Sequence, residues 1–476
     1  MTISITFRNR LLEFIHKKGK FYTMSETIAA IATSSSKSAI SVIRISGENA
    51  IIIADAVFKG ISGKSLSAHP GFIARLGRIY DAKGEIDEVI ATIYRAPKSY
   101  TGENTVEFSC HGGSYIARRV LEVVINAGAR PALAGEFTKR AVLAGKMTLT
   151  QAEAINEMIF AQGENAHKAA IGQYDGALYR RINCVKTKLV ETTAKIAAEL
   201  EFPEDDIEQT ASVQITKELS IIQKELQDTI NSYAQGKIIR EGISTVIAGK
   251  PNVGKSTLMN LLSKSNKSIV TEYAGTTRDI IEETIDVGGV CLNIADTAGL
   301  HQTQDNIEKI GVDLAQKRLE ISQLVLAVFD ISNPFNDDDY EIIKKLDKQN
   351  TLVILNKSDL PQKAVLTEIT AKFDYIIKIS AKLESNPKEI YDKINEITAK
   401  FNFDPTSGMI FSIRQLDCAK RAESALQQAI LANKNNMNDA AAVCTENAID
   451  ALMELTGEKI TETLLEEIFS KFCIGK

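Results

Sequence analysis

The segment from Gly249 to Ser256, which reads GKPNVGKS, has the residue types and spacing of a phosphate-binding loop. It follows an apolar run that predicts a strand and precedes a run that predicts a helix. Backbone N–H groups of such a loop hold phosphates at the helix N-terminus, where the helix dipole favours negative charge. In this pattern Lys255 contacts the β- and γ-phosphates and Ser256 is a ligand of Mg²⁺. We therefore expect a nucleoside triphosphate to bind here.

Four further motifs follow in the order expected of a guanine-nucleotide-binding domain. GTTRD supplies Thr277 as a second hydroxyl ligand of Mg²⁺, and DTAG places an aspartate near the metal and a glycine N–H at the γ-phosphate. NKSD supplies Asp359, which can accept hydrogen bonds from guanine N1 and the 2-amino group but finds no such donors on adenine. SAK can direct a backbone N–H to guanine O6. The predicted GTP-binding residues are Asn252, Val253, Gly254, Lys255, Ser256, Thr257, Thr271, Glu272, Tyr273, Ala274, Gly275, Thr276, Thr277, Asp296, Thr297, Ala298, Gly299, Asn356, Lys357, Asp359, Ser380 and Ala381.

Hydrolysis of the bound nucleotide needs a separate argument. Many GTPases carry a water-orienting glutamine directly after the DxxG motif, whereas this chain has Leu300, which cannot orient water. The sequence alone nominates no arginine finger. Another group must therefore assist turnover.

Length, charge and cysteine content limit the class of protein. At 476 residues the chain predicts roughly three domains of about 150 residues each. A net charge of −5 gives no overall attraction to nucleic acid, so contact with RNA has to use local patches. The six cysteines lie far apart without a CxxC pair, which favours a reducing cytoplasm over a disulfide framework or zinc site. No apolar run approaches the ~20 residues that span a bilayer, so we expect no membrane attachment.

The hydrophobic pattern changes twice along the chain. Residues 27–110 alternate short apolar runs with turn signals and predict strands, and a helix follows that ends at Gly128. From Thr150, where TQAE has the form of a capping box with Thr150 as N-cap and Glu153 at N3, helical spacing dominates. Strand–loop–helix alternation begins near residue 243 and predicts a parallel sheet, and helices return after about residue 405.

These changes predict a multidomain protein with one helical domain interrupted by an α/β domain. The fold class is an α+β N-terminal domain, a discontinuous α-helical domain and an inserted α/β P-loop G domain. The expected bounds are an extension at 1–23, then 24–144, a helical part at 145–240, the G domain at 241–402 and a second helical part at 403–476. The extension is basic and poor in acidic residues, which fits a disordered segment, a targeting segment or a start codon upstream of Met24.

The chain resembles the MnmE (TrmE) family of tRNA-modification GTPases over essentially residues 24–476. The resemblance rests on VIRISG, TGENTVEFSCHGG, GEFTKRAVLAGKMTLTQAEAI, EFPEDDI, GKPNVGKS, AGTTRD, DTAGLHQTQDNIEKIGV, NKSD and the terminal FCIGK. It implies an N-terminal domain of the folate-binding type that also forms a constitutive homodimer.

The resemblance also implies how hydrolysis is assisted. A potassium ion would be held by Asn252, Thr271, Tyr273 and Thr276, and dimerisation of the G domains would close the loop around it. The catalytic glutamate of the family matches Glu308, which would position the attacking water through a second, bridging water. Without the resemblance, Glu308 reads as an exposed charge on a helix.

Folate contacts are implied at Arg44, Glu107, Lys146 and the terminal Lys476. A carboxylate suits the donor-rich pterin edge, and cations suit a glutamyl tail. The chain departs from the family where a glycine-rich segment is usual, since it has Ser-Ser-Ser-Lys-Ser at 34–38. Any left-handed backbone conformation required there would be strained, which would weaken the binding of folate.

In the family, the GTPase works with the FAD-containing protein MnmG (GidA) on tRNA. Together they install aminomethyl or carboxymethylaminomethyl groups at C5 of the wobble uridine, with a 5-formyl- or 5,10-methylene-tetrahydrofolate derivative as one-carbon source. The alternative from another class is a regulatory GTPase of the Era/Der kind acting in ribosome assembly, but it should carry a basic KH-like domain. A third hypothesis, a scaffold that binds GTP without hydrolysing it, conflicts with the presence of Asn252 and Glu308.

Cys473, in the terminal sequence FCIGK, has several readings. CIGK is a poor prenylation box because of its Gly475 and terminal lysine, and a disulfide role lacks a partner nearby in sequence. As a plain helix end the segment makes sense, with Gly475 as a cap after an apolar stripe of Leu464, Leu465, Ile468, Phe469 and Phe472. The resemblance adds a catalytic role for Cys473 near the folate site, with its chemistry left open.

Overall fold

The computed structural model describes most of the chain in ranges separated by gaps. The described residues are 26–34, 37–201, 210–265, 283–295, 322–383, 387–398, 404, 407–459, 461–470 and 472–475. The expected extension at 1–23 lies outside these ranges. The chain forms two compact units, one of Met1–Ala152 with Ile460–Lys476 and the other of Glu153–Lys459.

The first unit is built on a sheet that has seven strands among the described residues, in the order β3-β4-β5-β6-β2-β1-β7. Neighbouring strands are antiparallel except β1 and β7, which are parallel. The strands are β1 (Ile28–Ile31), β2 (Ile40–Ser46), β3 (Phe58–Gly60), β4 (Ile73–Asp81), β5 (Gly84–Tyr94), β6 (Thr105–His111) and β7 (Arg130–Pro131). Between them lie α2 (Ala50–Val57), the 3₁₀ turn η2 (Leu66–Ala68) and α3 (Ser114–Asn126).

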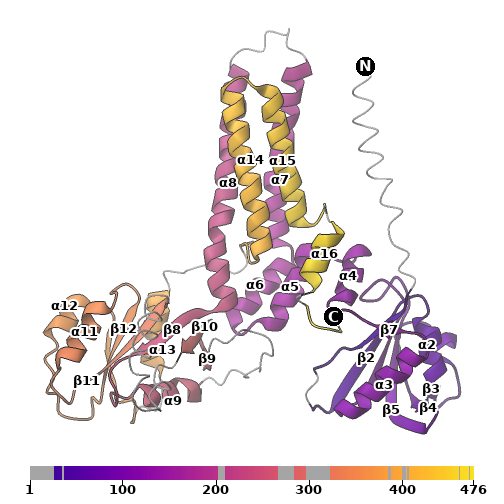
Figure 1. Ribbon diagram of the computed structural model, residues 1–476, viewed down its shortest axis with the longest axis horizontal. Coiled ribbons are helices and arrows are strands. Elements are labelled where there is room, and N and C mark those ends of the chain that lie inside the picture. Colours follow the sequence, from indigo (N-terminus) through magenta and orange to yellow (C-terminus); the bar gives the residue numbers. More distant parts are fainter. Residues whose placement is uncertain are drawn as a thin grey trace, which may run out of the picture. The chain divides into compact units, whose positions relative to one another are not determined.

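One face of this sheet is covered by α2 and α3, and the other is covered at β1, where Ile28 and Ala30 pack with Phe137, but open at β4 and β5, where Leu76 and Ile90 are exposed. Along β6, Val106, Phe108 and Cys110 are buried in the core that α2 and α3 complete (Figure 1). The alternate residues Glu107 and Ser109 point to the opposite face, because successive side chains of a strand alternate. The open face therefore carries polar and apolar side chains that helices α2 and α3 do not cover.

A second, smaller core joins α4 (Glu136–Leu143) to the C-terminal helix α16 (Glu462–Phe469). The apolar stripe predicted on the last helix is confirmed, because its residues pack into this core. Leu464 is partly buried, and the buried members are Leu465, Ile468, Phe469 and Phe472. Phe472 lies beyond the end of the helix.

An ionic network supports the start of α4. Arg140 is 3% exposed and donates to both Glu103 and Glu136, and Arg130 donates to Glu136 as well. Burial alone would raise the pKa of Glu136, but the hydrogen bonds from Arg130, the Leu133 N–H and Arg140 outweigh it and lower that pKa to about 2. Glu136 is therefore ionised and stabilising at neutral pH.

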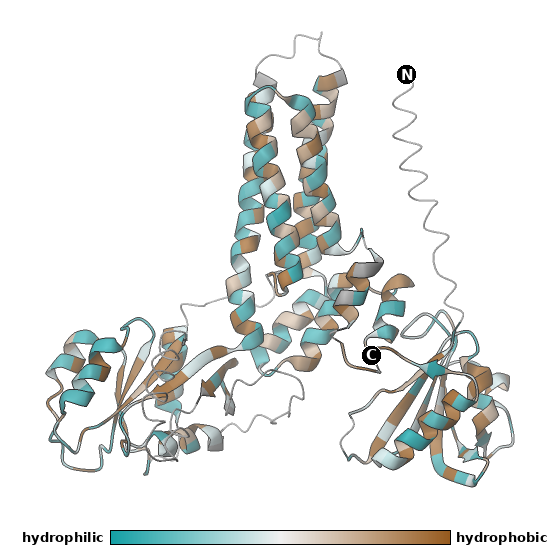
Figure 2. Cartoon of the chain, in the orientation of Figure 1, coloured by the Kyte–Doolittle hydropathy of each residue, from teal (hydrophilic) through white to brown (hydrophobic). Residues whose placement is uncertain are grey.

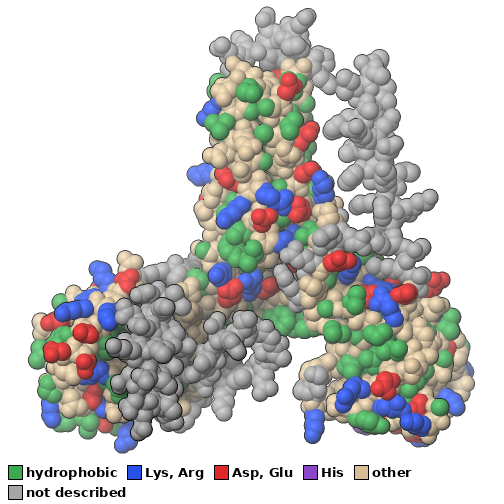
Figure 3. Space-filling model, viewed as in Figure 1, with side chains coloured by type: hydrophobic (Ala, Val, Ile, Leu, Met, Phe, Trp, Pro, Cys, Tyr) green, Lys and Arg blue, Asp and Glu red, His purple; other side chains and the backbone are tan. Residues whose placement is uncertain are grey.

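The second unit contains four long helices that lie side by side in Figure 1 and share one apolar core. They are α7 (Ala177–Glu201), α8 (Thr210–Glu241), α14 (Ile413–Lys434) and α15 (Asn438–Thr456), with α6 (Glu164–Tyr174) below them and α5 (Leu149–Phe160) crossing the division between the units. Along α7 the buried residues Leu178, Ile182, Val185 and Leu189 recur every three or four positions, which places them on one helical face. On the drawn surface of this bundle, acidic and basic side chains are mixed rather than gathered into one basic patch (Figure 3).

The same unit holds a mostly parallel sheet with six strands among the described residues, in the order β13-β12-β11-β8-β10-β9. Only the β9–β10 pair is antiparallel. The strands are β8 (Ile243–Ala248), β9 (Glu283–Val287), β10 (Val290–Ala295), β11 (Leu324–Asp330), β12 (Thr351–Asn356) and β13 (Ile376–Lys378). The described helices around it are α9 (Lys255–Ser265), α11 (Asp337–Lys345), α12 (Thr367–Lys372) and α13 (Lys388–Thr398). The central strands are almost wholly apolar, because helices bury both faces of a parallel sheet (Figure 2).

The predicted fold class is confirmed, since an antiparallel α+β unit, a helical bundle interrupted in sequence and an α/β domain are all present. The predicted capping box at Thr150 is wrong. The helix begins one residue earlier, and Thr148 and Gln151 exchange the capping hydrogen bonds, which leaves Glu153 free to pair with Arg414 at 2.8 Å. The domain bounds expected from the sequence stay a prediction. No helix within the described ranges is long and apolar enough to cross a membrane.

Candidate functional site

The segment from Gly249 to Ser256 joins β8 to α9, as the motif predicted. Asn252 and Gly254 have positive φ, of 65° and 106°. A Cβ at Gly254 would lie 2.2 Å from Asn356 Nδ2, so only glycine fits at this point of the loop. Lys255 begins α9 and its ammonium donates to the carbonyls of Gly249 and Lys250, both at 2.8 Å. The loop is thus wrapped around the lysine predicted to meet the phosphates.

Asn356 connects the phosphate loop to the loop predicted to meet the base. This residue is 4% exposed; its Nδ2 donates to Val253 O at 2.7 Å, and its Oδ1 accepts from the Ala381 N–H at 2.9 Å. Asp359 is exposed three residues further on, and Ser380 is buried with no hydrogen-bond partner for its Oγ among the described residues. Three segments far apart in sequence are therefore held together by one amide.

Two further ion pairs border the same region. Lys357 Nζ lies 2.7 Å from Asp330 Oδ2, and Lys250 Nζ lies 2.5 Å from Asp339 Oδ2. Burial opposes ionisation of Asp330, but hydrogen bonds from Lys357 and Ser332 outweigh it and lower the pKa of its carboxyl. Between these pairs is a cavity of about 220 Å³, which both lysines line together with Asn252 and Val253.

Ser256 and Thr257 are exposed in the first turn of α9, where a metal ion and phosphates have access. The other predicted nucleotide and potassium ligands lie outside the described residues; they are Thr271, Glu272, Tyr273, Ala274, Gly275, Thr276, Thr277, Asp296, Thr297, Ala298 and Gly299. Glu308 also lies outside them. Their predicted roles stay predictions.

In the first unit, Arg44 and Glu107 are brought together by strand register. They face each other across β2 and β6, and Arg44 Nε donates to Glu107 Oε1 at 2.7 Å. The guanidinium carbon lies 5.2 Å from the ring centroid of Tyr100 and 5.6 Å from that of Phe137. About one fifth of each charged side chain is exposed, so the pair stays accessible on the open face of the sheet.

Lys146 reaches the loop that carries Tyr100, where its Nζ donates to Pro97 O at 3.0 Å. The C-terminal segment contacts the turn before α4, because Cys473 O accepts from the Gly135 N–H and Ile474 pairs with Ala134. The three described residues predicted to contact folate therefore lie near one loop of the first unit. Lys146 contacts this loop at Pro97, and the Arg44–Glu107 pair lies beside it at Tyr100. Cys473 is exposed, and Lys476 lies outside the described residues.

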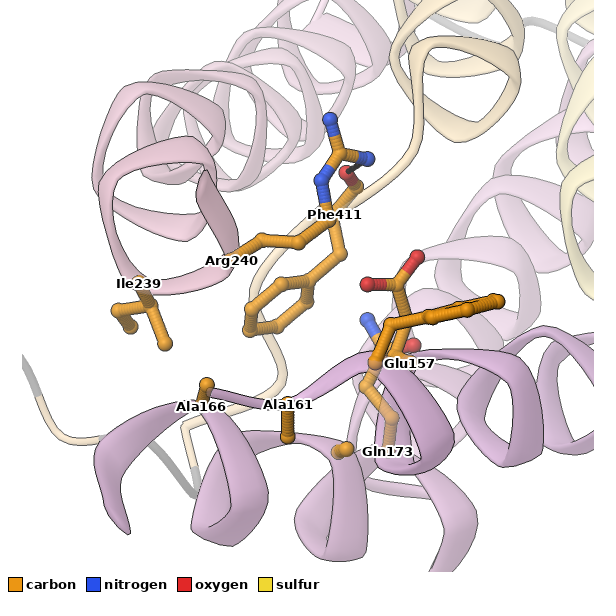
Figure 4. A pocket seen from close by; sticks show the side chains of 9 residues that line it. Glu157, Ala161, Ala166, Gln173, Ile239, Arg240 and Phe411 are labelled. Atoms are coloured by element: carbon orange, nitrogen blue, oxygen red, sulfur yellow. Dashed lines mark hydrogen bonds between the residues drawn. The ribbon is translucent and has the colours of Figure 1, made fainter. Parts of the chain in front are cut away.

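A separate small pocket lies where α5 and α6 meet the end of α8, lined by Glu157, Gln173, Arg240 and Phe411 among others (Figure 4). Arg240 donates to Phe411 O at 2.6 Å, and the Oε1 of Gln173 is buried with no hydrogen-bond partner in the part of the chain that the structure describes. Burial raises the pKa of Glu157 to about 7, with Arg240 opposing the shift. The pocket is distinct from the predicted nucleotide site, and sequence reasoning gave no sign of it.

Taken together, the α/β domain with its phosphate loop, set between two parts of a helical domain, defines a multidomain P-loop protein of the GTPase class. A family model described as the MnmE helical domain matches residues 149–473, and one described as the GTP-binding protein TrmE N-terminus matches residues 27–146.

The sequence is 38% identical over 457 residues to the tRNA modification GTPase MnmE of Clostridioides difficile, covering 95% of this chain and 100% of that protein. It is 37% identical over 462 residues to the same protein of Pediococcus pentosaceus, covering 95% and 99%. The chain therefore belongs to the MnmE family of tRNA modification GTPases. This confirms the resemblance and the class of enzyme predicted from the motifs.

Among solved structures, Era of Aquifex aeolicus is 26% identical and covers 39% of this chain and 67% of that one, with a TM-score of 0.25. A TM-score this low does not show that the two chains share an overall fold. The match of the N-terminal family model argues against the Era-like alternative, because such GTPases were not expected to carry an N-terminal domain of this type.

Sequence reasoning missed the residues that hold the site residues in place. Phe137 lies inside a motif stretch and Tyr100 directly precedes one, but nothing in their spacing shows that they flank Arg44. Lys250 and Asp330 were missed as well, since Lys250 occupies a variable position of the phosphate-loop pattern and Asp330 belongs to no motif.

Proposed function

We propose that this chain is a potassium-activated cytoplasmic GTPase that acts with an FAD-dependent partner of the MnmG (GidA) kind. Together they add a carboxymethylaminomethyl or aminomethyl group to C5 of the wobble uridine of certain tRNAs. GTP is hydrolysed to GDP and phosphate to drive conformational change in the complex. Family membership over 95% of the chain supports the tRNA-modifying role.

The observation that carries the GTPase proposal is the position of Asn356. Its amide joins the phosphate loop at Val253 to the segment at Ala381. A ligand with phosphates at one end and a base at the other spans this arrangement. Asp359, beside it, gives the base end its preference for guanine, because a carboxylate needs donors that adenine does not present there.

The described residues fit the proposed metal ions. The Ser256 hydroxyl lies exposed at the N-terminus of α9, where it would ligate Mg²⁺ together with Thr277. Asn252 is exposed, and its side chain makes no hydrogen bond to the described residues, so its amide oxygen is available to K⁺. Bound there with Thr271, Tyr273 and Thr276, the cation would supply the positive charge that an arginine finger provides in other GTPases.

Glu308 is the proposed catalytic residue for hydrolysis. Since Leu300 cannot orient water, a carboxylate further along the same motif stretch is the available base or water-positioning group. The proposal rests on the family's motif DNIEKIG.

The surroundings of Arg44 fit a tetrahydrofolate derivative. Glu107 offers a carboxylate to the donor-rich pterin edge, Tyr100 and Phe137 offer flat apolar faces, and Arg44 and Lys146 offer cations to a carboxylate tail. Bound folate would supply the one-carbon unit. The docked C-terminal segment keeps Cys473 in this unit and exposed, as a role in the modification chemistry requires.

We further propose that the open face of the first sheet binds a second copy of the chain. Leu76 and Ile90 face each other across β4 and β5 and are 48% and 45% exposed, and the Ser109 opposite Ile90 is paired in turn with Val42. This row crosses four strands beside Arg44 and Glu107. A symmetric dimer would bury the row without requiring another partner, since one patch meets its own copy.

GTP turnover in KCl and in NaCl tests the central proposal. We expect a sharp rise in KCl, and we expect Glu308→Ala to abolish turnover while leaving the affinity for GTP nearly unchanged. Equal rates in both salts would contradict the cation mechanism, and loss of GTP binding in the variant would contradict the role given to Glu308.

The tRNA proposal is tested by nucleoside mass spectrometry of tRNA from a deletion strain. The wobble uridines should lose their C5 aminomethyl-type groups, and return of the chain on a plasmid should restore them. An unchanged set of modifications would refute the tRNA-modifying role.

A further inference from the structure

Lys250, the second residue of the phosphate loop, is bonded to a helix that no nucleotide motif includes. Its Nζ donates to Asn336 Oδ1 at 2.7 Å and lies 2.5 Å from Asp339 Oδ2. These two acceptors form the capping box of α11, in which the side-chain oxygen of each residue also accepts from the backbone N–H of the other. The phosphate loop is thus tied to the first turn of α11 by one side chain.

This tie is not an ordinary surface ion pair. The side chain of Asp339 is 4% exposed and that of Lys250 is 24% exposed. A buried carboxylate that loses its cation is left with an uncompensated charge, whereas exposed pairs contribute little. Lys250 is therefore held in place more strongly than a lysine in a solvated pair.

The backbone of Lys250 faces the phosphate-binding lysine. Its carbonyl accepts from Lys255 Nζ at 2.8 Å, as the carbonyl of Gly249 does. Any displacement of Lys250 consequently displaces the peptide group on which Lys255 rests.

The segment that holds Lys250 also holds the guanine-reading motif. Asp330 ends β11 and lies 2.7 Å from Lys357 Nζ, and it is itself bonded by Ser332 and Asn333. Residues 330–339 therefore contact the phosphate loop at one end and the NKSD motif at the other. They enclose one side of the cavity of about 220 Å³ between the two motifs.

We propose that residues 330–339 brace the nucleotide site, and that Lys250 is a positioning residue that sets the phosphate loop at the correct separation from the guanine-binding loop. The proposal rests on the proposed function, because it concerns the binding of GTP and GDP. Lys250 acts through Lys255 and the loop backbone, so it contributes equally to the ground state and the transition state.

Loss of such uniform binding raises KM and Kd without changing kcat at saturation. Since a hydrogen bond to a charged group contributes about 1.5–3 kcal/mol, we expect Lys250→Met to weaken GDP and GTP binding by roughly 10- to 100-fold. We expect kcat to stay within about 2-fold of wild type. Lys250→Arg should restore most of the affinity, because a guanidinium can donate to both acceptors.

Lys372 supplies a matched control. Its Nζ donates to the carbonyls of Ile343 and Lys344 at the C-terminal end of the same helix, and it has no bond to the phosphate loop. Lys372→Met should lower the temperature of thermal unfolding without changing nucleotide affinity.

The experiment is a titration of the full chain with a fluorescent GDP analogue, combined with GTP turnover, for wild type and the three variants. Weakened binding by Lys250→Met with rescue by Lys250→Arg supports the brace. Unchanged affinity, a fall in kcat at saturating GTP, or an equal effect of Lys372→Met would overturn it.

If Lys250→Met does not fold, Asp339→Asn decides the question, since an asparagine keeps the capping acceptor but removes the charge that holds Lys250. Weaker GDP binding by that variant supports the brace, and unchanged binding overturns it. Failure of wild type to bind the GDP analogue would instead refute the proposed function, so the two failures are distinguishable.

Discussion

Glu157 makes the stability of the second unit depend on pH in a direction opposite to that of most carboxylates. Its side chain lies in the small pocket where α5 and α6 meet the end of α8 (Figure 4). Burial raises its pKa from 4.5 to about 7; Arg240 opposes the shift, and the carboxylates of Glu153 and Glu241 add to it. Folding therefore favours the protonated form.

The magnitude follows from the difference between the two pKa values. A shift from 4.5 to about 7 corresponds to about 3 kcal/mol of unfolding free energy. Below pH 4.5 the Glu157 carboxyl is protonated in both the folded and the unfolded state, so its ionisation does not lower the free energy of unfolding. Between pH 4.5 and about 7 the unfolded state is ionised while the folded state keeps its proton, so the stability falls as the pH rises, and the loss is complete once the folded pKa of about 7 is passed. Since Glu157 is partly exposed, the figure is an upper bound.

Glu157→Gln removes this penalty while keeping the size and polarity of the side chain. Thermal unfolding of the variant and wild type, followed between pH 4 and 8.5, should differ least near pH 4, diverge between pH 4.5 and about 7, and differ by a constant amount above that, the variant being more stable. For a cooperative unit of 150–250 residues, about 3 kcal/mol corresponds to a shift of roughly 5–10 °C.

Glu164→Gln is the matched control for this comparison. Glu164 is exposed on the surface of α6, and hydrogen bonding to Lys168 lowers its pKa. The difference between that variant and wild type should not grow between pH 4.5 and 7. A Glu157→Gln effect that is independent of pH, or larger in acid than in alkali, would refute the assignment of a raised pKa to this group.

Three further predictions concern other parts of the molecule. Ile90→Arg on the open sheet face should convert the dimer to a monomer in light scattering, whereas Ile52→Arg, 65% exposed on α2, should stay dimeric; a dimeric Ile90 variant would exclude this interface. Glu136→Gln should destabilise the protein at neutral pH, and its difference from wild type in urea unfolding should disappear as the pH falls from 4.5 towards 2; a difference that persists at pH 2 would contradict the depressed pKa. Asn356→Ala removes hydrogen bonds to the phosphate loop and to Ala381, so GDP should bind roughly 100-fold more weakly in fluorescence titration; unchanged affinity would show that the amide bridge does not position the nucleotide.

Much of the fold could be predicted from the chain because the informative patterns are local. The apolar spacing on α7 and the apolar runs of β11 and β12 each depend on residues within one element, and the structure has them where the patterns indicated. The phosphate loop was predicted in the same way, since its glycines and lysine are close in sequence. Thr150 shows the limit of such reasoning, because two adjacent capping patterns compete and the helix begins with the other one.

The supporting contacts of the candidate sites could not be predicted in this way, because their partners are distant in sequence. Arg44 meets Glu107 through the register of β2 with β6, 63 residues apart, and Glu153 meets Arg414 across 261 residues.

The sequence by itself determined the class of nucleotide, the order of the elements and, through motif resemblance, the family. Only the tertiary structure decided that Lys250 contacts α11, that Glu157 is largely removed from solvent and that the C-terminal segment contacts Gly135. The physical reason is that residue type and spacing govern backbone conformation over a few residues. Which charges are buried, and which side chain compensates them, depends instead on how distant segments pack.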